Sequence, residues 1–124
     1  MAKVSVMTLD QASLAGTPQV NGIETRVYFD RDADPIHMHL HRLEPGATLT
    51  LEGDPTDRLA YVWEGEIEAG GETLDKRSSL IVEHGRSASM TAGEDGATLV
   101  EFNMRERPAE PRAGGHVHLL PNRI

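Results

Sequence analysis

The chain contains 124 residues, and its 20 Asp and Glu against 12 Lys and Arg give a formal net charge of −8. This length suits one domain, because folding buries about 65–70% of the surface of such a chain and leaves little for a second core. The excess of carboxylates repels a phosphate backbone and argues against a nucleic-acid partner. The absence of cysteine excludes disulfides, thiolate nucleophiles and Cys-based metal sites, leaving His, Asp and Glu as possible ligands.

The hydrophobic pattern offers no segment that would span a membrane, since every apolar run is far shorter than about 20 residues. The N-terminal Met1–Val4 does not lead into the apolar region of a signal peptide, so we expect a cytoplasmic protein with no membrane partner. No phosphate-cradling glycine loop or dinucleotide fingerprint occurs, which predicts that no nucleotide cofactor is used.

Short stretches of alternating apolar and polar residues recur along the chain, and this period of two is typical of β-strands. In chain order they are Glu24–Phe29, Ile36–Leu43, Ala47–Leu51, Leu59–Ile67, Ser79–Glu83, Arg86–Met90, Ala97–Met104 and His116–Leu119. Turn-forming residues separate them, among them Glu44-Pro45-Gly46, Gly53-Asp54-Pro55, Gly70-Gly71, His84-Gly85 and Gly93–Gly96. Helical periodicity is hardly present outside Thr8–Leu14.

This many closely spaced strands predict an all-β, antiparallel sandwich or barrel, because closure or face-to-face packing buries their apolar sides. We expect a single domain over residues 1–124, with an N-terminal arm at 1–22 and a C-terminal arm at 105–124. Within the second arm, Arg105–Gly115 carries prolines and charges that oppose strand pairing, whereas His116–Leu120 is strand-like. The tail is therefore predicted to cross to another part of the barrel or to a second subunit.

Two segments, Leu43–Ala47 and Ala60–Ile67, resemble the cupin superfamily, specifically its small single-domain conserved-barrel members. The resemblance spans roughly Tyr28 to Met104 and implies an antiparallel double-stranded β-helix, the jelly-roll barrel. The first cupin motif, G-x5-H-x-H-x3-E-x6-G, keeps its spacing in this chain. Its positions are filled by Gly46, Glu52, Asp54, Arg58 and Gly65.

The metal-ligand positions of that motif are thus occupied by other residue types. In the second motif only the turn glycine, Gly85, is kept, and Ala88 stands where the resemblance places the fourth ligand. Arg58 would repel a divalent ion, but its planar fork can pair with Glu52 or Asp54. One hypothesis is that the guanidinium takes over the electrostatic role of the metal. The alternative is that Glu52, Asp54 and Arg58 are solvated charges at the barrel mouth.

The segment Ile36–Leu43 places His37, His39 and His41 on one face of a strand, because alternate residues share a side. The resemblance implies that this face, with Leu43, looks into the barrel, while Met38 and Leu40 pack outside under a second layer or a partner subunit. Glu101 and Asn103 share a side of a later strand that, by the same resemblance, borders the same cavity. Ala60 and Val62 are expected to face inward and leave room for a ligand, with Tyr61 and Trp63 outside.

Three functions remain open at this point. The first is acid–base catalysis by a lyase, isomerase or cyclase, in which a His abstracts a proton and Arg58 or Asn103 stabilises the oxyanion. The second is a metal-dependent oxygenase or lyase that binds Mn, Fe, Ni or Zn through His39, His41 and Glu101, although residues two apart on a strand lie about 7 Å apart. The third is non-catalytic binding of a small ligand.

The three functions draw on overlapping sets of residues. His39, His41, Glu101 and Arg58 are the predicted catalytic residues, and the predicted substrate contacts are His37, Asn103, Glu52, Asp54, Ala60 and Val62. By fold-level analogy we also expect a homodimer, with a small molecule as the other partner.

Overall fold

The structure, a computed structural model, describes residues 13–14, 21–29, 36–52, 56–104 and 117–121. Every regular element in these ranges is a β-strand. The strands are β1 Ser13–Leu14, β2 Ile23–Tyr28, β3 Ile36–Leu43, β4 Thr48–Glu52, β5 Arg58–Ala69, β6 Glu72–Leu74, β7 Ser79–Val82, β8 Ser87–Met104 and β9 Val117–Leu120. This part of the chain includes no helix of a length and apolarity that would cross a bilayer.

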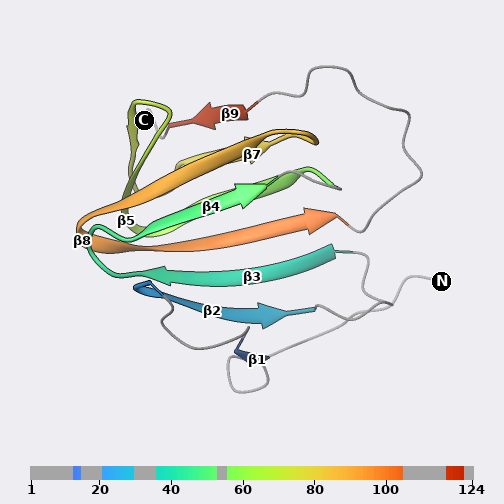
Figure 1. Cartoon of the computed structure of the whole chain (residues 1–124), viewed down its shortest axis with the longest axis horizontal. Helices are drawn as coiled ribbons and strands as arrows, with labels where there is room; N and C mark the ends of the chain where they lie inside the picture. Colours follow the sequence, from blue (N-terminus) through green and yellow to red (C-terminus); the bar gives the residue numbers. More distant parts are fainter. Residues whose placement is uncertain (1–12, 15–20, 30–35, 53–55, 105–116, 122–124) are drawn as a thin grey trace.

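All strand pairs are antiparallel, and the hydrogen-bonded order is β1-β2-β3-β8-β5-β7-β9, with β4 on β8 and β6 on β5 (Figure 1). The two longest strands, β5 and β8, belong to both layers. The first half of β8 pairs with β4, whereas its second half lies between β3 and β5. The predicted all-β antiparallel architecture is therefore confirmed.

Glycines let β5 and β8 bend where they cross each other. Gly65 and Gly96 have φ angles of 77° and 74°, and the pairing register shifts on either side of Gly65. The sequence predicted a chain-reversing turn at Gly93–Gly96 between two strands, and that prediction is wrong. Ser87–Met104 forms one strand, because a glycine with positive φ allows a bend within a strand without ending the ladder.

The apolar core lies between the two layers and takes residues from each of the strands β3 to β8. Its fully buried members include Ile67, Leu74, Leu80, Met90 and Leu99. Ala60 and Val62 are each 2% exposed, whereas Trp63 is 57% exposed, so β5 alternates as predicted.

Both chain arms contribute a strand within the described ranges. Ser13–Leu14 pairs with β2, so the end of the stretch with weak helical periodicity is a strand, while residues 8–12 lie outside the described ranges. In the C-terminal arm, Val117–Leu120 pairs with β7 of the same chain, and His118 forms an ion pair with Glu83. Of the two routes predicted for the tail, the structure has the one back to the barrel.

We predict that Gly65→Ala is strongly destabilising, because an added Cβ would lie 2.1 Å from the carbonyl oxygen of Gly96. Urea unfolding should show a loss of at least about 3 kcal/mol. Gly71→Ala is the matched control, since Gly71 has a similar φ of +79° but nothing within 4 Å of the added atom. It should lose only about 1–2 kcal/mol. Equal losses in the two variants would refute the steric account.

Candidate functional site

The three histidines of β3 lie on the same side of the sheet as Glu101 and Asn103, which belong to the second half of β8. In the register of the two strands, His37 lies opposite Asn103, His39 opposite Glu101 and His41 opposite Leu99. On the other side of β8, Arg58 of β5 lies opposite Asn103 and Ala60 opposite Glu101. Three adjacent strands thus bring the predicted polar residues together at one end of the interior, beside the apolar core.

The carboxylate of Glu101 is the centre of this cluster. The residue is 1% exposed, and both of its oxygens have partners. Oε1 lies 2.7 Å from His41 Nε2, and Oε2 accepts a hydrogen bond of 2.8 Å from Arg58 Nη1. The Arg58 side chain is 26% exposed, so the ion pair reaches from the interior to the solvent.

These contacts decide the protonation state of Glu101. Burial by itself raises the pKa of the carboxyl group, because it removes the charged form from water. The hydrogen bond with His41 and the charges of His41, Arg58 and His39 lower the pKa, and together they prevail. The pKa of Glu101 therefore lies below its ordinary value, and the side chain is an anion at neutral pH.

Thr25 of β2 extends the cluster on the far side of His41. Its Oγ1 lies 2.8 Å from His41 Nδ1, so both ring nitrogens are engaged, one by a hydroxyl group and one by a carboxylate. Sequence reasoning missed this residue. Its only sequence signal is that Thr25 and His41 are polar residues on two consecutive predicted strands. Their contact depends on the register in which these strands pair, which joins residues 16 positions apart.

Three half-buried polar residues, His37, His39 and Asn103, lie beside the buried contacts of Glu101. The rings of His39 and His41 stack with centroids 5.9 Å apart and planes inclined by 9°. Arg58 Nε and Asn103 Oδ1 are buried atoms with no hydrogen-bond partner in the described structure. A donor and an acceptor on opposed residues thus have no hydrogen-bond partner within the described structure.

Of the predicted motif positions near Arg58, the structure describes Glu52 and Ala88, and these two lie away from the Glu101 cluster. Glu52 is exposed at the end of β4, Asp54 lies outside the described residues, and Ala88 is partly buried against the apolar core. The predicted partners of Arg58 were Glu52 or Asp54, but its guanidinium pairs with Glu101. This difference has a simple cause. Arg58 points inward and lies opposite Asn103 of β8, and Glu101 is two residues from Asn103 on the same side of that strand.

The residues at this site do not fit a divalent metal ion. Within the described ranges, no group of three His, Asp or Glu side chains is arranged to ligate one, including the predicted set of His39, His41 and Glu101. Both Glu101 oxygens and both His41 nitrogens are already engaged, and the Arg58 cation sits beside the carboxylate. A second cation at this point would be repelled and would have to break these bonds.

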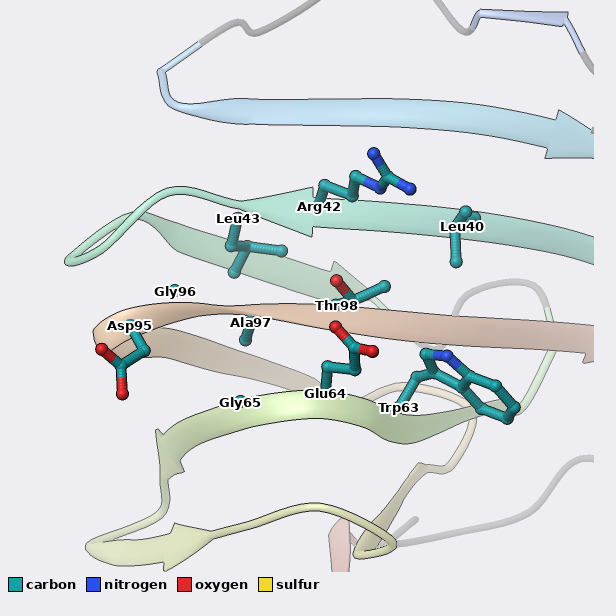
Figure 2. A pocket seen from close by; sticks show the side chains of 10 residues that line it. All are labelled: Leu40, Arg42, Leu43, Trp63, Glu64, Gly65, Asp95, Gly96, Ala97 and Thr98. Carbon is teal, nitrogen blue, oxygen red and sulfur yellow. The ribbon is translucent and has the colours of Figure 1, made fainter.

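A separate hollow of about 720 Å³ lies on the outer side of the same sheet. Figure 2 shows its lining residues, among them Leu40 and Arg42 of β3, Thr98 of β8, and Trp63 and Glu64 of β5. Leu40, Arg42 and Thr98 alternate with the inward-facing residues of their strands, so this hollow does not open onto the histidines. The polar cluster and this hollow therefore lie on opposite faces of the sheet.

Comparison with known proteins identifies the fold as the cupin jelly-roll barrel, as the sequence resemblance implied. A mutant of Bacillus subtilis oxalate decarboxylase OxdC matches with a TM-score of 0.67 at 18% identity, over 84% of this chain and 30% of that one. The Lactobacillus farciminis oxalate decarboxylase formate complex matches with 0.67 at 16%, over 84% and 34%.

KdgF from Halomonas sp. matches with a TM-score of 0.63 at 17% identity, over 84% of this chain and 96% of that one. The chain therefore spans nearly the full length of KdgF but only about a third of the oxalate decarboxylases. No family model and no curated protein matches the sequence.

We predict that Glu101→Gln lowers stability by about 3 kcal/mol at pH 7, because it leaves Arg58 and His41 facing a neutral amide in a buried site. The lowered pKa stabilises the fold above the carboxyl pKa of the unfolded chain, about 4.3, and this contribution disappears as the pH falls through the folded-state pKa. Urea titrations should therefore show the difference from wild type at pH 7 and a shrinking difference below about pH 4. Glu68→Gln, at an exposed position of β5, is the control. Equal stability of wild type and Glu101→Gln at pH 7 would refute the pairing.

Proposed function

We propose that this protein is a small-molecule enzyme of the cupin type, which transfers protons by means of the chain Thr25–His41–Glu101. The observation that carries the proposal is the set of two hydrogen bonds on one imidazole, 2.8 Å to Thr25 Oγ1 and 2.7 Å to Glu101 Oε1. An imidazole held at one nitrogen by a buried carboxylate is oriented for acid–base work at the other.

The direction of proton transfer follows from the charge on Glu101. Because the carboxylate is ionised, it accepts the proton on His41 Nε2, and Nδ1 of the neutral ring accepts the Thr25 hydroxyl proton. When a substrate gives a proton to Thr25 Oγ1, the hydroxyl proton passes to Nδ1, and the imidazolium formed is stabilised by Glu101. Return of the proton to another substrate atom completes an isomerisation, and loss of a leaving group completes an elimination.

Arg58 and Asn103 lie at the other end of the cluster from Thr25, so they would hold a remote polar group of a substrate long enough to reach the threonine. Arg58 Nε is a buried donor that lies on the same guanidinium as the Glu101 ion pair, and Asn103 Oδ1 is a buried acceptor across the strand pair. They fit a substrate with an oxyanion or carboxylate for the arginine and a hydroxyl for the asparagine. The similar structures include oxalate decarboxylases, one of them a formate complex, and carboxylates are therefore the first substrates to test.

Chemistry through a bound metal is the less favoured alternative. One of the similar structures is described by its Mn(II) centres, but Glu101, His41 and Arg58 satisfy one another in this chain and do not present a ligand set. Simple ligand binding would use Arg58 and Asn103 but would not need the hydroxyl–imidazole–carboxylate chain.

Proton abstraction can be tested without knowing the product. We expect the protein to exchange carbon-bound hydrogen of 2-keto or 2-hydroxy acids of increasing chain length for deuterium in D₂O, read by loss of the proton NMR signal. His41→Gln should lower the exchange rate by about 10²–10⁴-fold, the contribution typical of a positioned acid–base group. His118→Gln, at an exposed position of β9, is the control and should keep the wild-type rate.

Two further results of this experiment separate the alternatives. Prior treatment with a chelator should leave the exchange rate unchanged, whereas a metal-dependent route would lose it. Binding of the acids without exchange, weakened by Arg58→Met and not by His41→Gln, would contradict catalysis and support a binding protein.

A further inference from the structure

The hollow on the outer side of the sheet (Figure 2) is lined by charged and aromatic side chains as well as apolar ones. These groups are one guanidinium, two carboxylates, one hydroxyl group and one indole, and they belong to Arg42, Glu64, Asp95, Thr98 and Trp63. Within the described part of the chain, no hydrogen bond or ion pair joins the first four of these side chains to another residue. The hollow therefore presents charges that the fold itself does not use.

A β-bulge in β5 places the indole and one of the carboxylates side by side. Val62 lies opposite Leu99 of β8. The next register pair is Glu64 with Thr98, so Trp63 is an extra residue in β5. The bulge interrupts the alternation of sides, and Trp63 and Glu64 are consecutive, exposed and both part of the hollow. Bulges re-aim side chains in this way and are frequent beside functional sites.

The charges around the hollow are unevenly divided. On the β3 side, Arg42 lies beside Glu24 of β2 in the strand register, and Glu24 already forms an ion pair of 3.2 Å with Arg26. That side therefore has two cations and one carboxylate. The other charges of the lining are the carboxylates of Glu64 on β5 and Asp95 at the bend of β8. The hollow is thus positive on its β3 side and negative elsewhere.

We propose that the hollow binds a small zwitterion, a molecule with an alkylated ammonium group and a carboxylate. The ammonium group lies on the indole of Trp63 beside Glu64, and the carboxylate pairs with Arg42. This site is on the outer side of the sheet and is independent of the chemistry proposed for the interior.

Trp63 and Glu64 recognise the cationic end. An indole attracts cations more strongly than the other aromatic side chains do, and quaternary ammonium groups are typical ligands of such rings. Trp63 is 57% exposed, so its ring is accessible to a ligand. Glu64, the next residue, adds the opposite charge at the same place.

Arg42 recognises the anionic end, because its planar guanidinium group pairs with a carboxylate through two parallel hydrogen bonds. Arg42 and Glu64 lie on either side of Thr98, which separates their backbones by two strand spacings, about 9.5 Å. Both side chains are long, so a ligand with only a few atoms between its charged groups can contact both.

Other classes of ligand fit the hollow less well. An anion without a cationic group would meet Glu64 and Asp95, on a chain whose formal charge is −8. A cation without a carboxylate would be repelled by Arg42. An uncharged ligand could stack on the indole but would leave both signs of charge in the lining without partners.

Fluorescence titration of the full chain tests the proposal, because Trp63 is its only tryptophan. Three probes of similar shape separate the two charges. Glycine betaine carries both, choline carries only the ammonium group, and 3,3-dimethylbutanoate, the carbon isostere of glycine betaine, carries only the carboxylate. Glycine betaine should bind at least about fivefold more tightly than either of the others.

Substitutions assign each charge to its side chain. Glu64→Gln should weaken the binding of glycine betaine and of choline by at least about fivefold. Arg42→Met should weaken glycine betaine to the affinity of choline and should not weaken choline. Both side chains are exposed, so the variants should remain folded. Glu68→Gln and Arg77→Met, at exposed positions that do not line the hollow, are the controls and should bind glycine betaine as wild type does.

Three results would overturn the proposal. The first is no binding of glycine betaine at about 10 mM, which is also the result expected if a second copy of the chain covers this face. The second is binding of 3,3-dimethylbutanoate as tight as that of glycine betaine, because the ammonium contact would then contribute nothing. The third is unchanged binding of glycine betaine by Arg42→Met, because the carboxylate contact would then be absent.

Discussion

The buried ion pair between Glu101 and Arg58, shared with His41, is the interaction on which the polar half of this barrel depends. A carboxylate with 1% exposure is stable only when its lost hydration is replaced. Here a cation from β5 and an imidazole from β3 replace it, one on each side of β8. The same bonds that satisfy the charge therefore fix how the three strands present their inward residues.

That arrangement explains how a cupin barrel holds together with an arginine where the first motif normally has a carboxylate ligand. Arg58 supplies positive charge at the inner mouth of the barrel and Glu101, from another strand, supplies the counter-charge. A fixed internal cation makes an external metal unnecessary for charge balance. The Nδ1 atom of the imidazole beside it contacts the Thr25 hydroxyl group, and this is the contact that the proposed chemistry uses.

The sequence predicted the parts of this account that depend on alternation within one strand. His37, His39 and His41 share a side because of their spacing, as do Glu101 and Asn103. The contacts of Thr25 with His41 and of Arg58 with Glu101 were not predictable, since they depend on pairing between strands 16 and 43 residues apart. The turn wrongly predicted at Gly93–Gly96 has a similar cause. Glycines at these positions allow either a chain reversal or a bend within one strand, and the choice depends on the strands that pair with the segment.

The most direct test is ¹⁵N–¹H NMR of the imidazole nitrogens of His41, which shows which nitrogen of the neutral ring carries the proton. The account predicts that neutral His41 carries its proton on Nε2, donated to Glu101, and that Nδ1 accepts the Thr25 hydroxyl proton. A neutral ring protonated on Nδ1, with a bare Nε2, would mean that Glu101 is itself protonated and donates to the imidazole. That result would contradict the buried anion at the centre of the structure and the direction of proton transfer built on it.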